Sequence, residues 1–309
     1  MKFNSSIMVL LKKLFILFFL LLVIDFAAGA VLKYFFYRQK SGLDYQTIYS
    51  MKKSREDILF FGSSRASHHY VPSVFSDEFN MSAYNTGRDG NFILYGYSVA
   101  KSVLARHTPK LAVIDISRKE FQRKEGGYDY LSSLLPFYED NNGIRDILNQ
   151  RSRFERVKLF SRIYPYNSLF PVIALNVVRD KSKSANINGF IPLFRSIDRP
   201  MKTIETEPAY ELDTFLVDAF RQYLRAFKEK GIPVAVVCSP YYDKYVMKDA
   251  TIDSVNEICS QEAIPFLDYS QDPRFSGHQS KFDDFHHLNE EAAREFSKVC
   301  SDSLKKILF

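Results

Sequence analysis

The chain has 309 residues, of which 46% are hydrophobic and 25% charged, so it can bury the core of one large domain and is not a disordered protein. Residues 1–40 carry six basic side chains and one acidic side chain, which is +5 of the net charge of +6, and residues 41–309 are close to neutral. A near-neutral globular part gives no support for a basic stripe that binds nucleic acid, and we expect no nucleic-acid partner.

An apolar stretch at residues 14–32 follows Lys12 and Lys13 and contains one charge, Asp25. As a helix rising about 1.5 Å per residue, this stretch would nearly cross a hydrocarbon core of roughly 30 Å. We predict that residues 1–40 form a short cytoplasmic tail and a single transmembrane helix that anchors the chain in a membrane. The alternative is a signal peptide cleaved near Ala28-Gly29-Ala30, although the apolar run is longer than signal peptides usually have.

The charges around this helix bear on its contacts and its orientation. A carboxylate in lipid is costly, so Asp25 either marks contact with a membrane partner protein or lies near the interface. Basic residues are nearly balanced across the span and orient it poorly. The short N-terminal tail before a long domain favours a cytoplasmic N-terminus, which places the globular domain on the periplasmic or extracellular side.

Beyond the anchor, apolar or β-branched runs alternate with helical stretches. The predicted strands cover residues 57–61, 82–86, 111–117, 232–239 and 264–270, and the predicted helices cover 91–107, 210–230, 251–262 and 290–307. This alternation indicates an α/β domain over residues 41–309, a flavodoxin-like three-layer sandwich with a mainly parallel five-stranded sheet. A stretch of nearly ninety residues, at about 121–208, is predicted to be a helical insertion.

The three cysteines, Cys238, Cys259 and Cys300, lack metal-ligand spacing. In an exported domain Cys259 and Cys300 could form a disulfide, since both lie on predicted helices that flank the last strand. Three buried free thiols are an equal alternative.

Polar segments follow three of the predicted strands. Gly62-Ser63-Ser64 ends the first strand, residues 87–91 end the second, and residues 282–293 follow the last. In a parallel sheet these strand ends meet at one edge, where sites form. A serine becomes a nucleophile only beside a base, and Asp-x-x-His occurs twice in the last segment, as Asp283 with His286 and Asp284 with His287.

Gly-x-Ser after the first strand, Gly after the second and Asp-x-x-His-Leu-Asn before the last helix resemble the SGNH (GDSL-like) hydrolase superfamily over residues 55–309. The resemblance implies that Ser64 is the nucleophile, His287 its base and Asp284 the group that orients His287. It also implies an oxyanion hole formed by the backbone N–H groups of Ser64 and Gly90. No metal or other cofactor is expected.

One motif of that family is missing. Its members usually have Gly-x-Asn-Asp after the third strand, where the Asn completes the oxyanion hole, whereas this chain has IDISRKEF at 114–121. Asn91 and Asn85 are the candidates for a third donor. For Arg65 we expect an ion pair with an acid on the surface; the alternative is contact with an anionic substrate group.

The resemblance and the anchor together imply a function in the cell envelope. We expect a serine-dependent acyl-ester hydrolase or O-acyltransferase that acts on a cell-envelope glycan through an acyl-serine intermediate. The alternative is a non-catalytic assembly or carbohydrate-binding protein with the same fold. The histidine pairs at 68–69 and 286–287 could instead suggest a metal site. No carboxylate or cysteine lies at the usual ligand spacing beside the first pair, and Asp284 is better used to orient His287.

Overall fold

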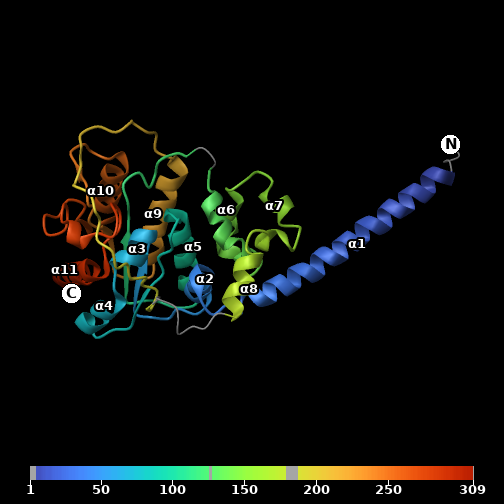
Figure 1. The fold of residues 1–309 in the computed structure, drawn as a ribbon, viewed down its shortest axis with the longest axis horizontal. Coiled ribbons are helices and arrows are strands. Elements are labelled where there is room, and N and C mark those ends of the chain that lie inside the picture. Colours follow the sequence, from blue (N-terminus) through green and yellow to red (C-terminus); the bar gives the residue numbers. More distant parts are fainter. Residues whose placement is uncertain (1–4, 125–126, 179–186, 309) are drawn as a thin grey trace.

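A computed structural model describes residues 5–124, 127–178 and 187–308 of the chain (Figure 1). Its main sheet has five parallel strands in the order β2-β1-β3-β5-β7. The strands are β1 (Ile58–Phe61), β2 (Ala83–Asn85), β3 (Leu111–Asp115), β5 (Val234–Cys238) and β7 (Phe266–Asp268). Each lies within one of the five predicted strands, and the prediction of a parallel sheet is confirmed.

Helices cover both faces of this sheet, which gives the predicted three layers. One face carries α2 (Gly42–Lys52), α5 (Ile93–Leu104), α9 (Thr214–Lys228) and α10 (Ala250–Glu262), and the other carries α3 (Ser64–His69), α4 (Pro72–Phe79) and α11 (Glu290–Leu308). Side chains along each strand alternate between the two cores: in β1, Leu59 and Phe61 pack on one face and Ile58 and Phe60 on the other. Both cores are therefore anchored on the same short strands, of which β1, β2, β3 and β5 are fully buried.

Of the two equal alternatives for the cysteines, the Cys259–Cys300 disulfide is wrong and three buried free thiols are found. All three cysteines are buried and free. Cys238 and Cys259 belong to the core on the α9 and α10 side, whereas Cys300 lies in the core under α11. The two predicted partners are separated by the sheet itself, which a disulfide cannot cross because its Cα atoms must lie within about 7 Å.

The segment between β3 and α9 is helical only in its first part. It contains the 3₁₀ helices η1 (Asp129–Phe137), η2 (Asn142–Ile144) and η3 (Tyr164–Tyr166) and the α-helices α6 (Arg145–Asn149), α7 (Glu155–Lys158) and α8 (Phe170–Val178). Residues 187–211 run without helix, and β4 (Thr203–Ile204) pairs there with β6 (Lys244–Tyr245). The last 3₁₀ helix, η5 (Gln279–Lys281), precedes the loop that leads into α11.

The N-terminal helix α1 (Ser5–Phe36) projects away from the domain on the side of α6, α7 and α8 (Figure 1). Among the described residues, it is the one helix long and apolar enough to cross a membrane, and a signal sequence has the same features. Residues 1–4 of the predicted tail lie outside the described part. The Asp25 carboxylate accepts hydrogen bonds from the Ser161 hydroxyl (2.6 Å) and the Arg162 N–H (2.7 Å). The hydrogen-bond partners of Asp25 thus come from a loop of the chain itself and not from the membrane partner protein considered for this residue.

Candidate active site

The strand order places the start of α3 where ligands bind in open α/β sheets. β1 pairs with β2 on one side and β3 on the other, so the connections leave it in opposite directions and open a crevice at its carboxyl end. Gly62 follows β1 with φ +150°, and a Cβ there would lie 2.9 Å from the Ala66 Cβ. Ser63 caps α3 by accepting from the Arg65 N–H (3.4 Å), so its hydroxyl serves the turn. Ser64 becomes the first residue of α3.

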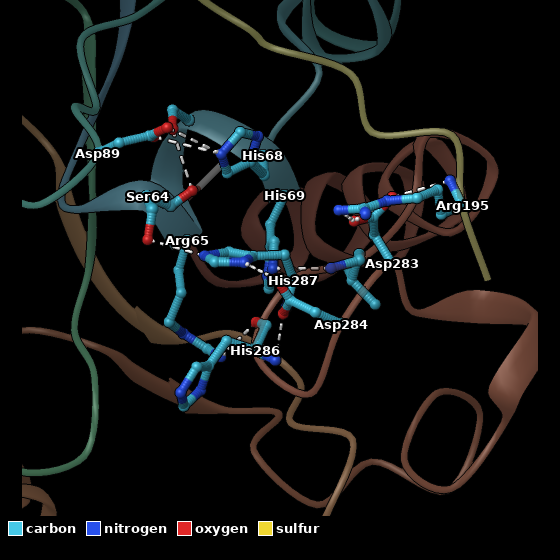
Figure 2. Close-up of polar contacts among 12 residues, drawn as sticks. Ser64, Arg65, His68, His69, Asp89, Arg195, Asp283, Asp284, His286 and His287 are labelled. Atoms are coloured by element: carbon cyan, nitrogen blue, oxygen red, sulfur yellow. Dashed lines mark hydrogen bonds and ion pairs between the residues drawn. The ribbon is translucent and has the colours of Figure 1, made fainter. Parts of the chain in front are cut away.

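Ser64, His287 and Asp284 form one chain of hydrogen bonds (Figure 2). His287 Nε2 lies 2.8 Å from Ser64 Oγ, and His287 Nδ1 lies 2.9 Å from Asp284 Oδ2. Because a carboxylate only accepts, Nδ1–H donates to Asp284 and leaves Nε2 as an acceptor for the Ser64 hydroxyl. This is the arrangement expected from the second Asp-x-x-His pair, with His287 and not His286 facing the serine.

The loop around His287 preorganises the Asp284 carboxylate. Its Oδ1 accepts from the backbone N–H groups of His286 (2.7 Å) and His287 (2.9 Å). Burial raises the pKa of Asp284, but the hydrogen bond with His287 and these two backbone donors outweigh burial and lower the pKa well below its ordinary value. Asp284 is therefore a carboxylate at any physiological pH and can support an imidazolium.

Asp283 has a different task from its neighbour. Its carboxylate accepts from the Arg195 backbone N–H (2.8 Å) and from Arg195 Nη2 (3.0 Å), and its own N–H donates to the His287 carbonyl (2.9 Å). Asp283 thus ties the segment 187–211 to the loop before α11, and the pair of Asp283 with His286 does not form.

Helix α3 holds the backbone on both sides of His287. Arg65 Nη1 donates to the His286 carbonyl (3.1 Å), and the Leu288 N–H donates to His69 Nε2 (3.0 Å). Since Nε2 accepts, the proton of neutral His69 is on Nδ1 and points at Ser239 Oγ, 2.9 Å away. Burial, with the charge of Arg65 second, lowers the pKa of His69 well below its ordinary value, so the ring stays neutral and keeps this acceptor.

The predicted surface ion pair of Arg65 is wrong in its location. The side chain is 3% exposed, lies 3.8 Å from the Asp115 carboxylate and stacks 3.8 Å from the centre of the Tyr241 ring. It also donates to Ser239 Oγ (2.9 Å) and borders the cavity in front of Ser64. The acid that Arg65 finds is at the end of β3, inside the protein, because α3 packs back over the sheet.

A second histidine–carboxylate pair lies beside the first. His68 Nδ1 lies 2.7 Å from the Ile191 carbonyl and Nε2 lies 3.2 Å from an Asp89 oxygen, and its ring meets the His287 ring edge-on at 5.0 Å between centres. Neither partner can donate, so both nitrogens carry protons when both contacts are made. Burial lowers the pKa of His68, but the bond to Asp89 outweighs it and raises the pKa above its ordinary value.

The hydroxyl of Ser64 opens onto a cavity of about 310 Å³. Its walls come from the ends of β1, β3 and β5 and from the loops that follow β2 and precede α11; they include Ser64, Gly90, Asn91, Phe92, Ser117, Arg118, Lys119, Glu207, Tyr241, Tyr245 and His287. Gly90 has φ +70° and no atom within 4 Å of the place of a Cβ, so the backbone at Gly90 faces open space. A substrate carbonyl at Ser64 would enter here.

Of the two candidates for a third oxyanion donor, Asn85 is wrong. Its Nδ2 donates to the Ala66 (2.7 Å) and Tyr70 (2.9 Å) carbonyls, which uses both N–H groups inside the core. Asn91 does border the cavity, but its Nδ2 donates to the Asp89 carbonyl (3.1 Å), which braces the loop.

Several side chains of the cavity were not predicted. Tyr241 follows β5 at the same sheet edge as Ser64, Tyr245 stacks on Arg118 at 4.1 Å, and Glu207 pairs with Arg118 at 3.2 Å. The signal for Tyr241 was available, because Ser239-Pro240-Tyr241 ends a predicted strand as Gly62-Ser63-Ser64 does. No pattern in the sequence pointed to Glu207, which reaches the cavity from an irregular segment. Within the described ranges, no group of three or more His, Cys, Asp or Glu side chains is placed to hold a metal ion.

Comparison with known proteins finds distant neighbours. No protein-family model and no curated protein matches the sequence. Among solved structures, a candidate acylhydrolase from Bacteroides fragilis has 12% identity and a TM-score of 0.43, over 85% of this chain and 95% of that one. A candidate lipolytic protein of the G-D-S-L family from Desulfitobacterium hafniense has 11% identity and a TM-score of 0.38, over 79% and 97% of the two chains. An acetyl xylan esterase has 10% identity and a TM-score of 0.39, over 82% and 99%. These neighbours are acylhydrolases and esterases, and at such distance the chemistry of this chain has to be argued from its own side chains.

Proposed function

We propose that this protein is a serine-dependent acyl-ester hydrolase or O-acyltransferase of the SGNH type, with Ser64 as nucleophile, His287 as general base and Asp284 as the carboxylate that orients His287. The observation that carries the proposal is the continuous hydrogen-bonded chain from Asp284 to Ser64 at the edge of a 310 Å³ cavity. A serine with a purely structural role would not be expected to combine a hydrogen bond to a histidine with access to an open cavity, and Ser64 has both.

The reaction proceeds in two transfers. Ser64 Oγ attacks the ester carbonyl carbon while His287 Nε2 takes the hydroxyl proton, and the backbone N–H groups of Ser64 and Gly90 stabilise the oxyanion. The tetrahedral intermediate then loses its alcohol, which receives the proton from His287 and leaves an acyl-Ser64 ester. In the second transfer water or a carbohydrate hydroxyl gives its proton to His287 and attacks the carbonyl carbon of this ester. The bond between the acyl carbon and Ser64 Oγ then breaks, Oγ recovers the proton from His287, and the acyl group leaves on the attacking oxygen.

The anchor suggests where this chemistry takes place. With α1 in the membrane and its N-terminus in the cytoplasm, the domain lies on the periplasmic or extracellular side, beside the glycans of the cell envelope. We propose such a glycan as acyl donor or acceptor. Hydrolase and transferase use the same residues and differ only in whether water or a sugar hydroxyl attacks the acyl-Ser64 ester.

A non-catalytic assembly or carbohydrate-binding role is the second candidate. The observation that favours it is that the segment after β3 supplies Ser117, Arg118 and Lys119 to the cavity where related hydrolases supply an asparagine. Loss of one oxyanion donor lowers the catalytic rate by roughly 10²–10³. A protein without the third donor could therefore bind its ligand and turn it over only slowly.

A fluorophosphonate probe decides between the two, because it labels an activated serine whatever the natural substrate is. We expect labelling of the wild type and of Ser63→Ala, and none of Ser64→Ala, together with turnover of a small acetyl ester that follows the same order. If the folded wild type is not labelled, the catalytic proposal fails and the binding role is the remaining candidate. Measurement of glycan O-acetyl content in a deletion strain then separates the transferase, which raises that content, from the hydrolase, which lowers it.

A further inference from the structure

The short helix α7 exposes large apolar side chains among basic ones. Phe154, Val157 and Phe160 are 52%, 72% and 69% exposed. The exposed basic residues Arg156 and Lys158 lie between them in the sequence, and the exposed Arg153 directly precedes Phe154. We call residues 153–160 the α7 tip. Large apolar side chains clustered on a surface mark a place of contact, and basic neighbours suit a partner with negative charge.

The α7 tip is held firmly in this pose. Glu155, the buried residue of the tip, accepts hydrogen bonds from Arg151 Nη1 (2.6 Å) and from the Tyr164 hydroxyl (2.7 Å). With Glu155 fixed to the insertion, the apolar residues on either side of it are turned outward. The hydrogen bonds of Glu155 therefore keep Phe154, Val157 and Phe160 exposed.

The residues that follow the tip bind directly to α1. Asp25 accepts from Ser161 and Arg162, as described above, and the Arg162 guanidinium lies 5.1 Å from the centre of the Phe26 ring. Gly29, one turn further along α1, is buried against Arg162, and a Cβ at Gly29 would lie 2.4 Å from the Arg162 Cβ. These contacts hold the residues directly after the α7 tip against α1 at the level of Asp25.

That level falls inside a bilayer if α1 spans one. With Lys12 and Lys13 at one surface, Asp25 is twelve residues, or about 18 Å, along the helix from Lys13. The hydrocarbon core is roughly 30 Å thick, so about 12 Å remains between Asp25 and the opposite surface. Tilt of α1 would place Asp25 deeper, and snorkelling of the two lysines would close only part of the distance.

We propose that the α7 tip inserts into the lipid leaflet on the side of the globular domain, with Phe154, Val157 and Phe160 among the acyl chains and the basic residues of the tip at the lipid phosphates. This inference rests on the proposed membrane anchoring by α1. It accounts for the carboxylate of Asp25, which in lipid needs internal partners and finds them in the loop after the tip. Two attachments, α1 and the tip, fix the orientation of the catalytic domain on the membrane.

Depth-dependent fluorescence in the full-length protein tests this. Single cysteines are introduced at Phe160 in the tip, at Phe194 as a matched control with 73% exposure in the segment 187–211 that runs without helix, and at Phe18 within α1 as a marker of anchoring. The three native cysteines are buried, so an NBD label attaches to the introduced one. The labelled proteins are reconstituted in vesicles of phosphatidylcholine and phosphatidylglycerol with and without doxyl-labelled lipid.

The expected result is a blue-shifted emission and quenching by doxyl lipid for the labels at positions 18 and 160, and neither for the label at position 194. If position 18 is quenched while position 160 behaves like position 194, the anchor holds and the tip proposal is overturned. If position 18 is not quenched either, the anchoring itself fails and the tip proposal with it. A blue shift at position 160 that grows with protein concentration and resists doxyl lipid would assign the tip to a second copy of the chain, which also overturns the proposal.

Discussion

Arg65, the residue after Ser64, donates a hydrogen bond to the carbonyl of His286, the residue before His287, over 3.1 Å. Ser64 and His287 are thus connected twice, once by their own side chains and once through their neighbours. Arg65 also lies beside Asp115 at the end of β3. Arg65 therefore links the backbone next to His287 to the central strands of the sheet.

Replacement of Arg65 by methionine, which keeps much of its length, is expected to lower both activity and stability. It leaves the Asp115 carboxyl without its cation and the His286 carbonyl without its donor, and removing one partner of a buried ion pair costs roughly 3–5 kcal/mol of unfolding free energy. Denaturant titration measures this loss.

The activity of the Arg65 variants gives the second part of that test. Arg65→Lys keeps the charge but not the fork of donors, so we expect its stability to exceed that of Arg65→Met while its kcat stays depressed. Wild-type kcat in Arg65→Lys would show that the contact with the His286 carbonyl does not position His287.

The two adjacent aspartates offer a matched pair of variants. Asp284→Asn keeps the size of the side chain but can present an amide donor to His287 Nδ1, which favours the wrong tautomer, and we expect kcat to fall by about 10²–10⁴. Asp283→Asn weakens the contacts with Arg195 and is expected to lower the melting temperature and leave kcat within about threefold of wild type. Equal losses of kcat in the two variants would contradict the separate roles of the two carboxylates.

Ser64 and His287 are expected to behave as one unit. Ser64→Ala and His287→Ala should each reduce turnover of an acetyl ester to nearly the same residual rate, because either change disables the nucleophile. The double variant should then be little slower than either single variant. Rate losses that multiply would indicate that the two side chains act independently, and His286→Ala, which keeps the backbone contacts of that residue, is the control.

The parts of this site that could be predicted are those that depend on local spacing. Asp284 and His287 are three residues apart in one loop, so their contact follows from that loop alone, and Ser64 follows a strand whose neighbours meet at one edge. The roles of Arg65 and His69 could not be predicted in this way. Their partners, Asp115, Ser239 and the backbone at residues 286 and 288, come from three other segments, and only the packing of α3 against β3, β5 and the last loop brings them together. The disulfide prediction failed for the same reason, because sequence neighbours of a strand do not reveal which face of the sheet their helix covers.

The buried ring of His69 predicts how stability depends on pH. Its pKa in the folded protein lies well below the ordinary value of 6.5, so below pH 6.5 the unfolded chain binds a proton that the folded chain does not. The unfolding free energy therefore falls as the pH falls, with a slope of up to about 1.4 kcal/mol per pH unit for this one group. Protonation of Nε2 also removes the acceptor for the Leu288 N–H, which links the loss of stability to the backbone beside His287.

Other groups titrate in the same range, so the observable is a difference between variants. Burial lowers the pKa of His286 to about 4, which adds to the slope, whereas burial raises the pKa of Glu120 to about 7, which opposes it. His69→Gln removes only the contribution of His69 to the pH dependence of the unfolding free energy. We expect the stability advantage of wild type over His69→Gln to shrink steadily between pH 6.5 and pH 5 in denaturant titrations. A wild-type advantage over His69→Gln that is independent of pH would mean that His69 binds a proton as readily in the folded protein as in the unfolded chain, which contradicts its role as acceptor for the Leu288 N–H.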